Sequence, residues 1–305
     1  FDVPGRRFFE IGSEEPGMLR KPLGLNTDAD CRVYVADGTT RSVMIYDQSG
    51  QFLRAVGGQK WFERLSHVTV DADGTRVFAV DTGGVNTSAH RVRVFDAQTG
   101  EHLYDIGSRG KEPGEFNLMR DAEIGPDGIL YVVDGGNFRV QAMGQDGNHV
   151  RTIGALGRRY GQFARPKGIA VDAGGTLHVV IDNENKNVFY TKSTDGGTTL
   201  TKISQWFSAP ASAHADHHAI VAHPGFNGTS NRIVYFGNDG GVYRANNVYT
   251  VATVSGWQEL NNNLGITQFY GAAGNSNTKV RWFAMPNATM GTSSQGRLQC
   301  VSTAQ

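Results

Sequence analysis

Short runs of alternating apolar and polar residues recur along the first 182 residues of the 305-residue chain. The clearest run ends in an aspartate and occurs four times, as VYVAD, VFAVD, LYVVD and HVVID, ending at Asp37, Asp81, Asp134 and Asp182. The intervals between these aspartates are 44, 53 and 48 residues. Alternation with a period of two predicts half-buried β-strands, and recurrence at this spacing predicts a repeat architecture.

Further strands accompany these runs. One precedes the run, as in LSHVTVD; one follows it, as in RVRVFD; and a fourth stops at a glycine, as in HLYDIG. Turns such as DADG, PDG and QDG separate the strands and supply the φ angles that short hairpins require. Each unit of four antiparallel strands is therefore predicted to be one blade of an all-β propeller.

The N-terminal residues 1–12 contain RRFFEIG, which matches the fourth strand of a unit without the three strands that should precede it. We expect this segment to complete the last blade, because pairing the two chain ends closes the ring and covers two edge strands. The chain is then predicted to be a single β-propeller domain over residues 1–305, with six four-stranded blades. The expected blades are about 17–58, 62–107, 114–154, 161–205, 214–262 and 266–304, the last completed by residues 1–12.

Two segments carry a family resemblance. GEFNLMRDAEIGPDGILYVVDGGNFRVQAMGQDG and YGQFARPKGIAVDAGGTLHVV resemble NHL repeats in the GxF lead, the Pro-x-Gly-Ile-Ala-Val-Asp strand and the Tyr-Val-x-Asp strand. The resemblance covers residues 1–182 and implies propeller blades of the NHL type.

The pattern changes after Asp182, where charged residues fall from 45 of the first 182 to 13 of the last 123. STDGGTTL resembles an Asp-box, which implies a structural role in a hairpin turn for Ser193, Asp195, Gly197 and Thr199. Residues 183–278, with HADHHAIVAHP and VYFGNDGGVYR, resemble the BNR-type repeats of sialidase-like and sortilin-like propellers. Residues 279–305 resemble nothing that we recognise, so we expect a hybrid propeller, either natural or recombined.

Charge and cysteine content limit the kinds of partner and site that we expect. The formal net charge is zero, so no overall field attracts phosphates and we expect no nucleic-acid partner. No apolar stretch approaches the roughly 20 residues of a membrane span, so we expect no membrane insertion.

Cys31 and Cys300 lack the spacing of a metal site, and they either form one disulfide between the chain ends or remain buried thiols. The chain begins at Phe1, as in a mature or trimmed product, and we expect an extracellular or periplasmic location.

The starts of the innermost strands face the mouth of a central channel, and they carry the candidate metal ligands His67, Asp121 and His218. Histidine nitrogen and carboxylate oxygen suit a divalent metal such as zinc, manganese or iron. The strand that bears His67 also resembles the histidine-bearing strand of peptidylglycine alpha-amidating lyase, which implies a zinc site, although Asp121 would replace a histidine of that family. The alternative is that these side chains hydrogen-bond to neighbouring blades and to water.

The function expected first is non-enzymatic binding or protein interaction through loops on one propeller face, with a protein or a carbohydrate as the ligand. The longest predicted connections are Thr82–His90, Ala209–His217 and Asn246–Ser255. The aromatic residues near blade junctions either contact the ligand or pack between blades; they are Trp61, Tyr160, Trp206 and Phe207. No catalytic residue is assigned. The alternatives are a metal-dependent lyase or hydrolase with its site in the channel, and a structural subunit of a larger assembly.

Overall fold

The computed structural model describes residues 10–157, 162–171, 175, 177–182, 188–193, 199–214, 217–223, 225–261, 280–284 and 298–303. Within these residues the chain forms β-strands and two short 3-10 turns, η1 (Gly135–Asn137) and η2 (Trp206–Ser208), and it contains no α-helix. No helix in the described part of the chain is long and apolar enough to cross a membrane.

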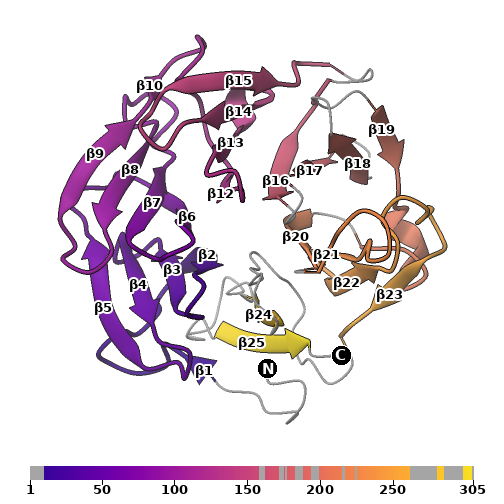
Figure 1. Cartoon of the computed structure of the whole chain (residues 1–305), viewed down its shortest axis with the longest axis horizontal. Helices are drawn as coiled ribbons and strands as arrows, with labels where there is room; N and C mark the ends of the chain where they lie inside the picture. The colour runs from indigo at the N-terminus through magenta and orange to yellow at the C-terminus, as the bar shows by residue number, and fades with distance from the viewer. Residues whose placement is uncertain are drawn as a thin grey trace.

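Five four-stranded antiparallel sheets surround a common axis, and in each the strands follow chain order from the axis outwards (Figure 1). The first contains β2 (Pro22–Thr27), β3 (Val33–Asp37), β4 (Ser42–Tyr46) and β5 (Phe52–Gly57). The second contains β6 (Leu65–Val70), β7 (Arg76–Asp81), β8 (Arg91–Asp96) and β9 (His102–Ile106). The third contains β12 (Asp121–Ile124), β13 (Leu130–Asp134), β14 (Arg139–Met143) and β15 (His149–Ile153). The fourth contains β16 (Pro166–Val171), β17 (Leu177–Asp182), β18 (Val188–Ser193) and β19 (Thr199–Lys202). The fifth contains β20 (His217–Ala222), β21 (Val234–Asn238), β22 (Gly241–Ala245) and β23 (Trp257–Glu259). A short parallel pair, β10 (Ser108–Arg109) and β11 (Glu115–Phe116), lies in the connection between the second and third sheets.

A sixth sheet joins the two ends of the chain. Its strands are β1 (Glu10–Ile11), β25 (Leu298–Thr303) and β24 (Val280–Ala284), in that order. The antiparallel pairing of Glu10 with Gln299 confirms that the N-terminal segment pairs with the C-terminal strand. Six four-stranded sheets were predicted, whereas the described residues contain five, together with this three-stranded sheet. The predicted sixth blade falls largely outside the described residues, so six complete blades are not established.

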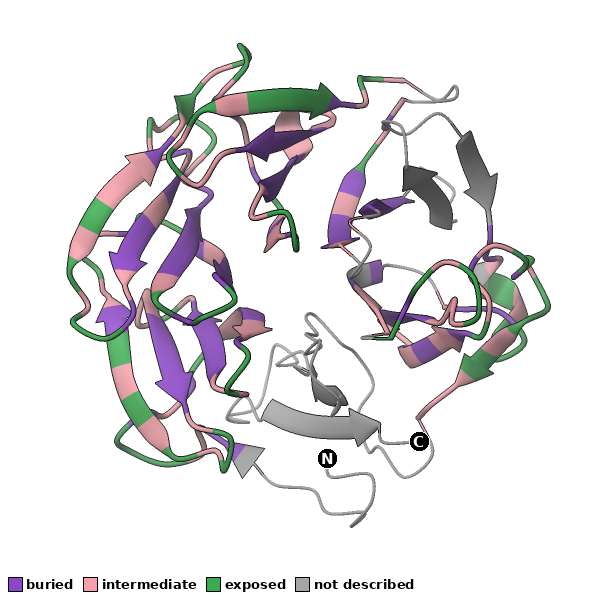
Figure 2. Cartoon of the chain, in the orientation of Figure 1, coloured by how far each residue is buried: buried purple, intermediate pink, exposed green. Residues whose placement is uncertain are grey.

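Burial is greatest in the second strand of the first and third blades and lower both in the first strand and in the outer strand (Figure 2). All five residues of β13 are buried, whereas β15 is mostly exposed and Val150 retains 53% of its surface. The second strand of a blade is covered on both faces by neighbouring blades, which explains why its sequence is almost continuously apolar. Each buried Val, Leu or Phe side chain contributes about 1.5–3 kcal/mol through the hydrophobic effect.

The repeated aspartate at the end of each second strand is a structural residue where its side chain is described. Asp37 is fully buried, and its Oδ2 accepts the backbone N–H groups of Arg20 (2.7 Å) and Lys21 (2.6 Å). Asp81 accepts the N–H of Arg64 in the same way (2.9 Å), and Asp134 accepts the N–H of Asn117 (2.7 Å). The aspartate therefore fixes the segment that leads into the first strand of its own blade.

Candidate functional site

Every second strand ends and every first strand begins on one face of the ring, which we call the connection face. This follows from the antiparallel order of each sheet. Contacts between blades agree with it, because the hydroxyl of Thr82, directly after β7, donates to the carbonyl of Met119, two residues before β12 (3.1 Å). First strands lie nearest the axis (Figure 1), and successive first strands are in contact with one another. Side chains at the starts of these strands therefore meet around the axis.

His67 and Asp121 form the clearest contact at this end of the axis. Nε2 of His67 lies 2.9 Å from Oδ1 of Asp121, and the two side chains are only 16% and 13% exposed. Oδ2 of Asp121 accepts the backbone N–H of Ile169 (2.9 Å), so the carboxylate joins the second, third and fourth blades. On the other side of the imidazole, a Cβ added at Gly24 would lie 2.5 Å from Nδ1 of His67. The imidazole is therefore held between a glycine and a carboxylate.

Glu123 stands two residues further along β12, so it shares a face of this strand with Asp121. Burial, and then the negative charge of Asp121, raise the pKa of the Glu123 carboxyl well above its usual range. The backbone of Val171 hydrogen-bonds to Glu123 and opposes this change, but it does not reverse it. Glu123 is therefore held towards its uncharged, protonated form.

The strand register gives the position of each predicted metal ligand. His67 lies opposite Val80, and Asp121 lies opposite Val133, at matching places in their blades. In the fifth blade the matching residue is Ala219, opposite Gly237, while His218 falls at the register shift between His217 and Ala219. The side chain of His218 lies outside the described residues. Among the described residues no group of three His, Cys, Asp or Glu side chains has the geometry of a metal site.

Three arginines directly precede the first strands of the second, third and fourth blades, and the sequence reasoning missed them. Arg64 directly precedes β6, Arg120 directly precedes β12, and Arg165 directly precedes β16. All three side chains are exposed, and in the described part of the chain none of them forms an ion pair with a carboxylate. Aligning RLSHVTVD, MRDAEIG and RPKGIAVD would have revealed a basic residue at the start of three consecutive blades.

The predicted aromatic binding residues have different environments. Trp61 is partly buried, stacks on His102 with ring centroids 4.4 Å apart, and packs edge-on against Phe95 at 5.6 Å. It joins the hydrophobic cluster shared by the first two blades. Phe207, in η2, is 67% exposed on the connection between the fourth and fifth blades. Tyr160 and the side chain of Trp206 lie outside the described residues.

The loop Thr82–His90 is fixed by polar contacts on the connection face. Nδ1 of His90 accepts the backbone N–H of Leu118 (3.0 Å), so its Nε2 carries the proton and donates to the carbonyl of Gly84 (2.9 Å). Arg109 donates to the carbonyls of Val85 (2.7 Å) and Thr87 (2.9 Å). Val85, at the tip, remains 67% exposed.

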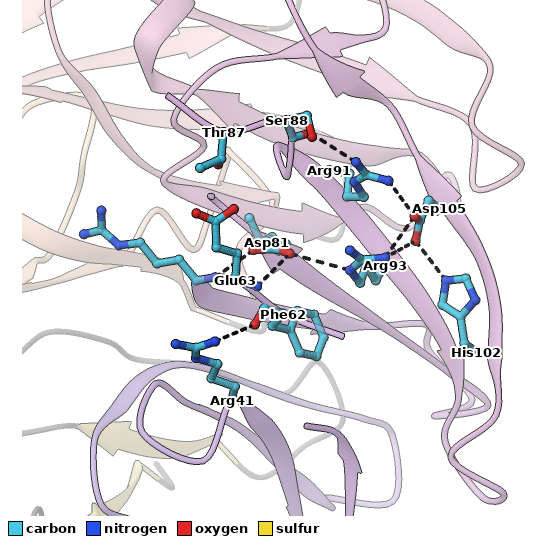
Figure 3. Close-up of polar contacts among 12 residues, drawn as sticks. Arg41, Phe62, Glu63, Asp81, Thr87, Ser88, Arg91, Arg93, His102 and Asp105 are labelled. Carbon is cyan, nitrogen blue, oxygen red and sulfur yellow. Dashed lines mark hydrogen bonds and ion pairs between the residues drawn. The ribbon is translucent and has the colours of Figure 1, made fainter. Parts of the chain in front are cut away.

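A charged network on the second blade supports the base of this loop (Figure 3). Arg91 donates to the carbonyl of Ser88 (3.1 Å) and pairs with Asp105 (3.1 Å). Asp105 also pairs with Arg93 (3.0 Å) and with His102 (2.8 Å), whose ring carries the stacked Trp61. The network therefore links the loop to the outer strand of the blade.

Two of the three predicted loops belong to the connection face. Thr82–His90 joins β7 to β8, and the segment Ala209–His217 leads into β20, whereas Asn246–Ser255 joins β22 to β23 on the opposite face.

The residues of the predicted Asp-box flank a hairpin. β18 and β19 pair antiparallel, with Lys192 opposite Thr199. Asp195 and Gly197, and the side chains of Ser193 and Thr199, lie outside the described residues. The two alternatives for Cys31 and Cys300, a disulfide or buried thiols, are likewise not tested, because the side chain of Cys300 lies outside the described residues.

The chain matches no family model and no curated protein. Several solved structures share its fold. The PQQ-bound aldose sugar dehydrogenase of Streptomyces coelicolor is 15% identical with a TM-score of 0.64, and the match covers 93% of this chain and 95% of that one. A catalytically inactive virginiamycin B lyase of Staphylococcus aureus with quinupristin is 13% identical with a TM-score of 0.59, covering 98% and 88%. A chain of a nidogen/laminin complex is 14% identical with a TM-score of 0.61, covering 84% and 86%.

These relatives are β-propeller proteins, and the likeness shows that this chain has the β-propeller fold. They include both enzymes and a member of a protein complex, and at such low identity they say nothing about the function of this chain. The NHL and BNR resemblances stay predictions.

Proposed function

We propose that this protein is a binding scaffold that recognises a protein partner through the connection face of its propeller. The proposal includes a six-bladed ring formed by a single domain over residues 1–305, with NHL-type blades in residues 1–182 and BNR-type blades in residues 183–278. It also includes an extracellular or periplasmic location.

The main support for the proposal is the loop Thr82–His90, whose backbone is fixed by hydrogen bonds. Arg109 and His90 hold its backbone, while the apolar Val85 remains 67% exposed at the tip. A loop that is ordered before binding loses less conformational entropy when a partner docks, so more of the contact energy appears as affinity. An exposed apolar side chain on such a loop is typical of a contact point.

Phe207 adds a second exposed apolar side chain to the same face. Large aromatic side chains contribute much of the binding energy at protein interfaces. The two positions belong to different blades, so a partner that contacts both would span the connection face.

The test is quantitative affinity purification with Val85→Asp and Phe207→Asp, using Val150→Asp on the outer strand β15 as the matched control. We expect a specific protein that the wild type and Val150→Asp retain and that both connection-face variants lose. Equal recovery by all four proteins, or no specific recovery by the wild type, would contradict the proposal. A carbohydrate ligand would instead appear as binding of the wild type to a glycan array without any protein partner.

A second candidate is an enzyme with a metal at the axis, and the contact between His67 and Asp121 favours it. These two side chains, from two blades, bring a nitrogen and a carboxylate oxygen within 2.9 Å of each other. Elemental analysis of protein purified without chelators or a histidine tag tests this candidate. Stoichiometric metal in the wild type that is lost from His67→Ala supports it, and wild-type protein without metal rejects it.

A further inference from the structure

Three arginines lie at the connection-face end of the axis, although the whole chain has a formal net charge of zero. Arg64, Arg120 and Arg165 come from the second, third and fourth blades, each at the start of the strand nearest the axis. The register places Arg120 one residue before Asp121, and it places Arg64 and Arg165 three residues before His67 and Gly168. The three cations therefore surround the same end of the axis.

The arginines are close enough to act on one another. β12 contacts both β6 and β16, so Arg120 lies between Arg64 and Arg165, and the charges of these two arginines act on it. The stem of Arg120 lies against the backbone of Gly135, where an added Cβ would come within 2.8 Å of Cγ. The carboxylate of Asp81 accepts a hydrogen bond from the backbone N–H of Arg64 (2.9 Å), which fixes the backbone at this residue. Like charges are thus kept together by the fold.

No acid in the described part of the chain forms an ion pair with these arginines. The nearest carboxylate in sequence, Asp121, instead contacts His67 (2.9 Å) and the N–H of Ile169 (2.9 Å). Because unpaired like charges destabilise a fold, a cluster of three arginines without ion pairs indicates a ligand of the opposite charge.

We propose that Arg64, Arg120 and Arg165 bind a small oxyanion, a ligand with a phosphate or carboxylate group, at the connection-face end of the propeller axis. The planar guanidinium group presents paired N–H donors that match the oxygens of such anions. Groups from three blades can contact one ligand from three sides, which favours a compact anion over an extended chain. This site is independent of the protein partner proposed for the loop Thr82–His90.

Calorimetric titration of the full chain at pH 7.5 and low ionic strength, with inorganic phosphate and separately with malonate, tests the proposal. We expect one ion to bind per chain, with affinity that falls as salt is added. Arg120→Gln should weaken this binding at least tenfold, while Arg151→Gln, which removes an exposed arginine from the outer strand β15, should leave it unchanged. Preference for phosphate or for malonate then identifies which oxyanion group the site accepts.

Thermal unfolding gives a second readout that does not require tight binding. Without added anion, Arg120→Gln should unfold at the same or a higher temperature than the wild type, because it removes repulsion. Added phosphate should raise the unfolding temperature of the wild type and of Arg151→Gln, but not that of Arg120→Gln. Failure of the wild type to bind either anion, or equal loss of binding in Arg151→Gln, would overturn the proposal. Val85→Asp should still bind phosphate, so the two proposals can fail separately.

Discussion

At the scale of residues, one position near the start of each first strand determines which side chains meet at the axis. The residues at this position in the five four-stranded blades are Gly24, His67, Asp121, Gly168 and Ala219. Small residues on some blades leave room for the large ones on their neighbours. His67 depends directly on this, because its imidazole lies against Gly24.

Gly24→Ala should therefore destabilise the protein by about 1–3 kcal/mol, as overpacking does in other cores. The added Cβ would lie 2.5 Å from Nδ1 and 2.7 Å from Cα of His67, so backbone as well as side chain must move. Gly168→Ala is the matched control, because its Cβ would be 3.4 Å from the nearest atom, Oδ2 of Asp121. Urea unfolding of both variants checks this prediction, and equal losses of stability would contradict it.

Glu123→Gln should stabilise the protein at neutral and alkaline pH. The pKa of Glu123 is raised in the folded state, so its contribution to stability is complete below the unfolded pKa of about 4.3 and is lost as pH rises towards the folded pKa. The advantage of the glutamine variant should grow through that window, by about 1.4 kcal/mol for each unit of pKa difference. Unfolding free energies measured between pH 4 and pH 9 test this. A difference that does not change with pH, or that matches the exposed control Glu101→Gln, would show that Glu123 ionises normally.

At the scale of elements, the outer strands of the second blade are joined by charge rather than by apolar packing alone. Burial opposes ionisation of Asp105, but the hydrogen bonds from His102 and Arg91 and the charge of Arg93 outweigh it and lower the pKa of this carboxyl. The same network supports the loop Thr82–His90 through Arg91 (Figure 3). The order of this loop therefore depends on β8 and β9.

Asp105→Asn should cost about 1.5–3 kcal/mol at pH 7, because the carboxylate accepts several charged hydrogen bonds. A lowered folded pKa means that this contribution is present above the unfolded pKa of about 3.9 and is lost as pH falls through the folded value. The gap between wild type and variant should close in that acidic range. Denaturant unfolding of wild type and variant across this pH range measures the gap. Asp30→Asn, at a highly exposed position, should show neither effect.

At the scale of the whole molecule, the ring is closed by strands from opposite ends of the chain. β1 pairs with β25, and Ile11 of β1 is buried against Leu19 and Tyr46 of the first blade. Among the described residues, this closure pairs the C-terminal strand β25 on both sides, so its edges are not open for pairing with another molecule.

Ile11→Asp should therefore lower the unfolding temperature markedly and increase aggregation, because it places a charge in the cluster that joins the first blade to the closing sheet. We expect a loss of at least about 2 kcal/mol, the burial energy of the isoleucine alone. Val150→Asp, on an exposed outer strand, should change stability by no more than about 0.5 kcal/mol. Calorimetry and light scattering measure both effects, and similar behaviour of the two variants would argue against closure through β1.

Local pattern predicts much of this fold because alternation and turn residues act over a few positions. The second strands of the first four blades end at Asp37, Asp81, Asp134 and Asp182, as expected. The candidate site was harder to predict. His67 and Asp121 were placed together because they begin equivalent strands. In the fifth blade Ala219, and not His218, occupies the matching position, although β6 and β20 have the same register shift. The sequence alignment of β20 was therefore one residue off, and only the strand pairing corrects it.

The sequence by itself determined the all-β repeat, its strand order and the pairing of the chain ends, because a period-two pattern and turn glycines encode them locally. Only the tertiary structure decided which side chains meet. Trp61 packs on His102, and Arg64, Arg120 and Arg165 gather at one end of the axis, although up to about a hundred residues separate them in sequence. The physical reason is that these contacts join segments far apart in the sequence, and their geometry depends on strand register and packing rather than on any local pattern.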